Sequence, residues 1–279
     1  MTKRQHQKGF TLVELAIVMV IIGLLIGGVL KGQAVLNQSR VTATTAQVTT
    51  YDTAAKAFFD TYKEFPGDMV NAPDRLPDCA NCGVYAVPIN TPCTTQDGAG
   101  NGVIGDCQWN MQSFQSASYA GTPTGSAGDY AHETVLFWLE LSKAGLISGI
   151  TKDGITNVPA SFGGSLPAAR VGGGFLVGYA NPAGVATGTG ALPPNSMGPG
   201  TVLVLTQYPA ALTATASQQV LSAAMAAQMD RKMDDNMPSS GIVRSYGAAA
   251  NCYTGSSPPA YLESSAKKSC GLFFSILVP

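Results

Sequence analysis

The chain has 279 residues, with 16 lysines and arginines against 17 aspartates and glutamates and a formal net charge of −1. Only 12% of the residues are charged and 45% are hydrophobic, which disfavours a nucleic-acid-binding protein, normally basic, and a disordered chain, normally rich in charge. The 32 glycines and 17 prolines indicate a body rich in loops rather than a helical bundle.

The first nine residues form a basic leader, and the next 21 form an apolar run. Lys3, Arg4 and Lys8 carry the charge of the leader, and residues 10–30 contain one charged side chain, Glu14. Twenty-one residues span roughly 31 Å as a helix, which matches the hydrocarbon core of a bilayer. The sequence therefore predicts a membrane-spanning helix with its leader in the cytoplasm and the rest of the chain on the other side.

Two simpler interpretations fit this terminus less well. A secretory signal peptide has a shorter apolar core and a small-residue cleavage site, whereas this run continues into a polar helical pattern after Lys31. A plain signal anchor fits the length but leaves Glu14 unexplained, because a carboxylate at mid-bilayer costs about 2.5–3.5 kcal/mol on insertion scales. The position of Glu14 therefore indicates a function.

The stretch KGFTLVE resembles the leader junction of type IV pilins and type II secretion pseudopilins, with Gly, then Phe, then Glu as the fifth residue after the Gly. The resemblance implies cleavage by a prepilin peptidase between Gly9 and Phe10 and N-methylation of Phe10. It also implies that Glu14 pairs with the amino group of a neighbouring subunit during filament assembly. Electrostatics agrees, since a carboxylate is favoured in the first turn of a helix and needs a cation in a low-dielectric bundle.

Apolar residues continue beyond Lys31 at three-, four- and seven-residue steps, from Leu36 to Tyr62, so one helix is predicted from about residue 10 to 64. Pro66 is expected to end it. Within the apolar half, the glycines have small-xxx-small spacing, which favours close helix packing and is compatible with local loosening of the helix. These glycines are Gly23, Gly27, Gly28 and Gly32.

The expected fold class is α+β. The resemblance implies a pilin fold, in which a long N-terminal helix, transmembrane in its hydrophobic half, packs on a small antiparallel sheet with additional helices and long Gly-rich loops. The expected domains are the leader (1–9), the transmembrane half (10–30) and amphipathic half (31–65) of the helix, and a globular head (66–279).

Three motifs follow one another in an order that resembles a subgroup of large pilin-like proteins. They are FPGDMVNA (65–72), DGAGNGVIG (97–105) and ETVLFWLELSKAGLISG (133–149). We predict helices at 133–144 and 216–235, strands at 171–179, 201–208 and 271–278, and a surface loop at 181–200. The apolar side chains of both helices are expected to pack in the core, including a methionine ladder in the second.

Six cysteines follow the membrane segment, in a compartment where an even number predicts disulfides. Cys252 and Cys270 form the natural carboxy-terminal pair, which resembles the disulfide loop of type IV pilins. The other four allow three pairings and are Cys79, Cys82, Cys93 and Cys107. A zinc site built from these four is the alternative, because C-x2-C is a metal spacing, but the oxidising location argues against it.

The run from Asp97 has the first, fifth, sixth and eighth positions of a calcium loop but lacks acids at the third and twelfth. A calcium site at Asp97, Asn101 and Asp106 is therefore a hypothesis, with a plain glycine turn as its alternative. No other cofactor is expected. The pair Asp234-Asp235 is interpreted as a solvated helix end.

No enzymatic motif stands out in the sequence. After cleavage at Gly9 the chain would hold one histidine, His132, and it has no nucleophile elbow or phosphate loop. We therefore expect a structural filament subunit of a type IV pilus or type II secretion pseudopilus, of the minor kind because the head is large. The alternative is a tip adhesin or a membrane-anchored protein of the same machinery that contacts secretion substrates.

The resemblance also implies partners and a location. The expected partners are the prepilin peptidase, other pilin or pseudopilin subunits and the inner-membrane assembly platform, with membrane lipid before assembly and no nucleic acid. The expected location is the bacterial inner membrane, crossed once with the carboxy-terminal domain in the periplasm, followed by a periplasmic or cell-surface filament.

Overall fold

The computed structural model describes residues 12–79, 82, 100, 102, 104, 133–150, 161–180, 200–207, 219–247, 250–255 and 258–276. The chain divides into two compact units, Met1–Arg40 and Val41–Pro279. Helix α1 (Leu12–Tyr62) contributes residues to both units. This long helix is the one predicted from the apolar run and the periodicity that follows it.

The two parts of α1 differ in what surrounds their side chains. In the first unit the apolar side chains are exposed, including Leu36 at 59%, which we expected on the buried face. In the second unit Val41, Val48 and Phe58 are buried in the core of the head. Periodicity identified the helix, but the buried face begins only at Val41, where the head provides a surface to pack against.

The helix ends before the predicted proline. Lys63 has a φ of 61°, in the left-handed region, and its N–H donates to the Phe59 carbonyl over 2.7 Å. A left-handed residue directly after the last helical residue is a common way for a helix to stop. The chain has therefore already turned when it reaches Pro66, and the short helix α2 (Ala72–Arg75) follows.

The sheet has five antiparallel strands, and β5 lies at its centre. The strands are β1 (Gly174–Ala180), β2 (Gly200–Thr206), β3 (Leu221–Ser222), β4 (Val243–Gly247) and β5 (Lys268–Ser275). The order β1-β2-β5-β3 forms one path, and β4 also pairs with β5. In the register, Leu203 lies opposite Phe274 on β5, and Val243 lies opposite the same residue from β4.

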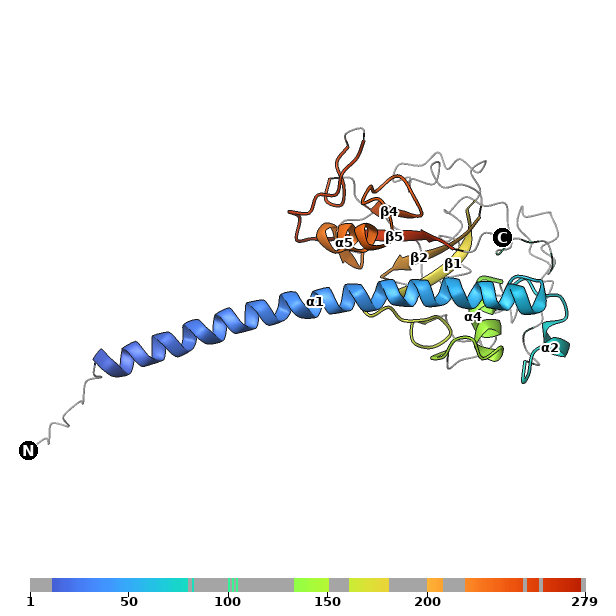
Figure 1. Cartoon of the computed structure of the whole chain (residues 1–279), viewed down its shortest axis with the longest axis horizontal. Helices are drawn as coiled ribbons and strands as arrows, with labels where there is room; N and C mark the ends of the chain where they lie inside the picture. The colour runs from blue at the N-terminus through green and yellow to red at the C-terminus, as the bar shows by residue number, and fades with distance from the viewer. Residues whose placement is uncertain are drawn as a thin grey trace, which may run out of the picture. The chain divides into compact units, whose positions relative to one another are not determined.

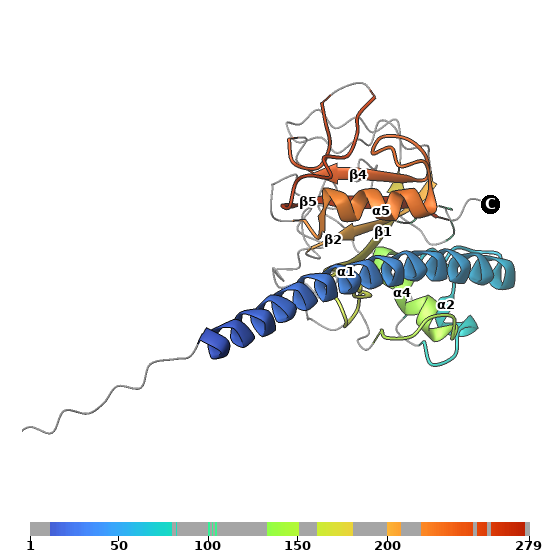
Figure 2. The same cartoon turned by 60° about the vertical axis from the view of Figure 1, so that its left-hand side comes forward.

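Two helices complete the head. Helix α4 (Glu133–Lys143) ends one residue before the predicted position, and Gly145 follows with a φ of 73°. Helix α5 (Ala223–Met233) lies beside β4 and β5 (Figure 2). Its predicted start at residue 216 is wrong, because Leu221 and Ser222 pair with β5 and the Ser222 side chain then caps the helix by accepting from the Met225 N–H.

The structure corrects the strand predictions at several points, and β5 begins at Lys268, three residues before the predicted 271. Strand β1 begins at Gly174 instead of residue 171, because a turn precedes it in which the Ala169 N–H donates to the Gly173 carbonyl over 3.0 Å. The sequence does not predict strand β4, since its VRSYG stretch is only five residues long and places Arg and Ser between Val243 and Tyr246. The turn before β1 is a local contact, whereas β4 exists through its pairing with β5, which lies farther along the chain.

The second half of α1 packs against the sheet and α4 (Figure 1). The Tyr51 ring lies edge-on to Trp138 of α4 and to Phe175 of β1, with ring centroids 5.1 and 5.4 Å apart. Polar contacts reinforce this packing, since Gln47 of α1 donates to the Ala168 carbonyl and accepts from the Arg170 N–H, both over 3.0 Å. The predicted α+β class and the small antiparallel sheet beside a long helix are confirmed.

Candidate functional sites on the amino-terminal helix and in the head

The first unit presents an exposed apolar helix with an acid near its start. Glu14 lies in the first turn of α1 and is exposed, and its neighbours Leu12 and Val13 are 87% and 67% exposed. The most apolar 18-residue window has a mean hydropathy of 2.7 and none of it is buried, so the helix is long and apolar enough to cross a membrane. Gly9 and Phe10 lie outside the described residues.

The glycines of this segment make no close contact within the described chain. A Cβ placed on Gly23, Gly27, Gly28 or Gly32 would meet no atom within 4 Å. The described residues of this chain therefore do not make the close packing that this spacing favours.

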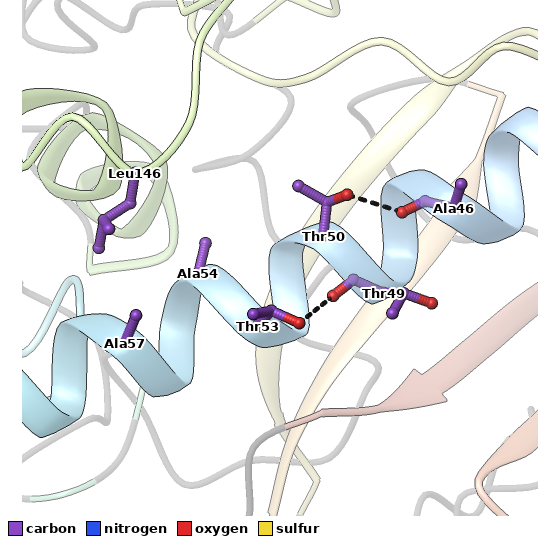
Figure 3. A pocket seen from close by; sticks show the side chains of 7 residues that line it. All are labelled: Ala46, Thr49, Thr50, Thr53, Ala54, Ala57 and Leu146. Carbon is purple, nitrogen blue, oxygen red and sulfur yellow. Dashed lines mark hydrogen bonds between the residues drawn. The ribbon is translucent and has the colours of Figure 1, made fainter.

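The second half of α1 carries a shallow groove on the side that the head leaves open. The groove has a volume of about 570 Å³. Seven residues line it: Ala46, Thr49, Thr50, Thr53, Ala54, Ala57 and Leu146. Six of them belong to α1, and Leu146 reaches the groove from the segment after α4 (Figure 3).

The threonines make this groove less polar than their residue type suggests. Thr50 donates its hydroxyl to the Ala46 carbonyl and Thr53 donates to the Thr49 carbonyl, both over 2.8 Å (Figure 3). Thr49 does the same to Thr45 over 3.2 Å. A hydroxyl that bonds back to its own helix leaves the methyl group for contact with a partner. The floor of the groove is therefore a surface of small groups that another helix could approach closely.

A second candidate site lies in the turn that follows α1. Asp68, 1% exposed, accepts from the Gly100 N–H with one carboxylate oxygen and from the Gly102 N–H with the other, over 2.5 and 2.7 Å. These contacts bring together the first two motifs of the head. Positive φ angles of 90° and 80° at Gly100 and Gly102 suit glycine at both positions.

The third motif meets this turn through Glu140 of α4. Glu140 is 0% exposed, and its Oε2 accepts from the Gly67 N–H over 2.6 Å. Its Oε1 is buried and has no hydrogen-bond partner among the described residues. Burial raises the pKa of the Glu140 carboxyl to about 8, against the lowering effect of the Gly67 N–H, and the charges of Asp68 and Glu64 raise it further.

Sequence reasoning missed the roles of Asp68 and Glu140. The available signal was an acid within the apolar run VLFWLEL, on a helix whose other side chains were expected in the core. That signal identifies an unusual position but does not identify Gly67, 73 residues earlier, as its partner.

The structure joins Cys252 to Cys270 and Cys79 to Cys82, each pair with Cα atoms 5.2 Å apart. The first pairing is the one that the pilin resemblance implies. Cys93 and Cys107 lie outside the described residues. So do the calcium-loop residues Asp97, Asn101 and Asp106, and calcium binding there stays a prediction.

The acidic end of α5 is only partly solvated. Asp230 is 0% exposed, and its carboxylate accepts from the Tyr261 hydroxyl over 2.7 Å and from the Asn236 N–H over 3.0 Å. Asp234 accepts from the Ile242 and Val243 N–H groups. Asp235 accepts from the Met237 N–H and the Ser240 hydroxyl. The three carboxylates lie close enough to share a cation, but these hydrogen bonds use five of their six oxygens to hold the turn between α5 and β4.

Comparison with known proteins identifies one family feature. Residues 4–30 match the family model of the prokaryotic N-terminal methylation motif. Searches of curated proteins and of solved structures found no match to the chain. The family match confirms the prepilin-type signature, which implies processing by a prepilin peptidase and assembly with other pilin subunits. The chain therefore carries a prepilin-type methylation signature at its amino terminus, on an α+β protein with a long first helix that is apolar enough to cross a membrane.

Proposed function

We propose that the protein is a structural subunit of a type IV pilus or type II secretion pseudopilus, cleaved after Gly9 and assembled through α1. The observation that carries this proposal is the methylation motif at residues 4–30, placed on a helix whose apolar half is exposed from Leu12 to Leu36. An isolated copy would leave this surface in contact with lipid or water. A membrane before assembly and a bundle of such helices afterwards would both bury it.

Glu14 is proposed to act in assembly. Cleavage creates an ammonium group at Phe10, and a carboxylate one turn into the helix can pair with that group on an offset neighbour. In a bundle of apolar helices an unpaired carboxylate would be costly, so pairing selects the arrangement of subunits that brings the two charges together.

The groove on the second half of α1 is proposed as a contact surface for a neighbouring copy. The exposed apolar segment of α1 supplies a partner of the right chemistry, and the groove floor offers methyl and Cβ groups without bulky side chains. Small residues at such a surface allow helices to approach closely and increase their van der Waals contact.

The minor role and the location complete the proposal. The head, residues 66–279, is large for a subunit that is repeated along a whole filament, which favours a minor subunit in the inner membrane with its head in the periplasm. The same size supports the second candidate, a tip adhesin or a subunit that contacts secretion substrates. Labelling the head on sheared filaments separates the two, because a tip protein labels only filament ends.

The test is mass spectrometry of the mature amino terminus in cells that contain a prepilin peptidase. The expected product begins with N-methylated Phe10, and an intact Met1 would contradict the proposal. A Glu14→Ala variant is expected to be cleaved normally, because Glu14 lies outside the scissile bond, but to enter sheared filaments poorly. Normal incorporation of this variant would contradict the pairing role while leaving the processing result unaffected.

A further inference from the structure

Glu140 is a buried acid that forms no ion pair with any residue that the structure describes. Its side chain is 0% exposed, one oxygen accepts a single N–H from Gly67, and the other has no partner among the described residues. Within the described part of the chain, the charged groups whose fields act on it are Asp68, in the turn after α1, and Glu64, just before that turn. Glu64 is itself paired with Arg75 over 2.6 Å, so that cation already has a partner.

The contact that Glu140 makes joins separate parts of the head. Gly67 belongs to the turn after α1, and its neighbour Asp68 holds the Gly100 and Gly102 amides. Helix α4 is held in the head by Leu136, Trp138 and Leu141, which are fully buried in the core. Residues 66–69 of the turn are buried as well, and Met69 belongs to the same core, so the junction between the turn and α4 is closed to water from both sides.

We propose that the Glu140 carboxyl is a pH-sensitive latch, which holds the turn after α1 against α4 when neutral and loosens that junction when ionised. An ionised, buried carboxylate with one hydrogen bond gains free energy if water reaches its second oxygen. Water can reach that oxygen if the turn separates from α4. Because Asp68 lies next to Gly67, the Gly100 and Gly102 contacts are expected to loosen together with it.

The pH range follows from the direction of the shift. The pKa of Glu140 is raised from its ordinary value of 4.5 to about 8, so the folded junction holds its proton more tightly than an open one. The stabilisation is fully present below the ordinary pKa and is lost as the pH rises towards about 8. Within that range the equilibrium between closed and open junction changes by up to roughly tenfold per pH unit.

Hydrogen–deuterium exchange of the full-length protein in detergent micelles tests this latch. Exchange rates are measured at about pH 6 and about pH 9 and divided by the intrinsic exchange rate of an unprotected amide at each pH. The resulting protection is compared for peptides covering residues 63–72 and 133–143. We expect protection of the 63–72 peptide to fall by about tenfold or more at the higher pH. A Glu140→Gln variant, which keeps an acceptor for the Gly67 N–H but does not ionise, should show equal protection at both.

The control is Asp60→Asn, which removes a carboxylate 80% exposed near the end of α1 and should behave as the unchanged protein. Unchanged protection in the natural protein, or the same pH-dependent loss in Glu140→Gln, would overturn the proposal. If Glu140→Gln does not fold, the carboxyl carbons of glutamate are labelled with ¹³C in the natural protein and titrated by NMR. One glutamate should then titrate far above the others, and its absence would overturn the latch.

Discussion

At the scale of single residues, a tight steric constraint in the sheet lies between Gly271 of β5 and Tyr246 of β4. Tyr246 is fully buried, and its hydroxyl donates to the Leu205 carbonyl of β2 over 2.9 Å. A Cβ placed on Gly271 would overlap the Tyr246 ring. Glycine at position 271 is therefore needed for space, so that one tyrosine can cross β5 and bond to the strand beyond it.

A Gly271→Ala variant is expected to lose about 1–3 kcal/mol of unfolding free energy, because the buried ring has no room to move aside. Urea unfolding of the full chain in micelles measures the loss. Gly255→Ala is the matched control, since a Cβ at this exposed glycine meets no atom within 4 Å. Equal stability of the two variants would show that the strands separate to accept the methyl group.

At the scale of elements, the disulfide segment from Cys252 to Cys270 is tied to the head at several points. The bond itself ends on β5, and the Leu262 N–H donates to the Cys252 carbonyl over 2.9 Å. Two side-chain contacts fix the segment to α5: Tyr261 to Asp230 and Arg231 to Glu263, each over 2.7 Å. The exposed Arg231–Glu263 pair adds little by itself, so the buried tyrosine and the disulfide dominate.

Replacement of both Cys252 and Cys270 by Ser is expected to lower the unfolding free energy by about 3 kcal/mol, the value of a loop of this length in the chain-entropy model. Urea unfolding measures it. The control replaces Cys79 and Cys82 by Ser, where the bonded residues are only three apart and the loop released is far shorter. A larger loss in the control would mean that local packing, and not loop closure, sets the value of these bonds.

At the scale of the whole molecule, the proposed function requires surfaces that a single copy leaves unused. The exposed apolar side chains of the first unit are one, and the groove of small residues in the second is another. Their chemistry is complementary, since an apolar helix can pack against a floor of methyl and Cβ groups.

A Thr53→Arg variant is expected to enter sheared filaments at least several-fold less than the natural protein, because its charge would be desolvated in the groove. The stability of the isolated head should change little, since Thr53 is exposed. Thr61→Arg is the matched control: Thr61 is also exposed on α1 and bonds back to its own helix over 2.8 Å, but it does not line the groove. Equal incorporation of both variants would exclude the groove as a subunit contact.

The sequence by itself determined the features that depend on neighbouring residues. The apolar run and its 3.6-residue continuation predict α1, and the KGFTLVE stretch predicts the methylation motif that residues 4–30 match. Runs of β-branched and aromatic residues predict β1, β2 and β5 within a few positions. These features can be predicted because helix periodicity, strand alternation and a peptidase motif each depend only on residues within one short segment of the chain.

Only the tertiary structure decided the features that depend on distant partners. Strand β4 and the delayed start of α5 exist because β5 offers hydrogen bonds to both segments. The threonines of α1 looked polar, but their hydroxyls bond back to the helix and leave methyl groups in the groove. The environment of Glu140 depends on Gly67, 73 residues away, because burial and charge are properties of the assembled fold and not of any local pattern.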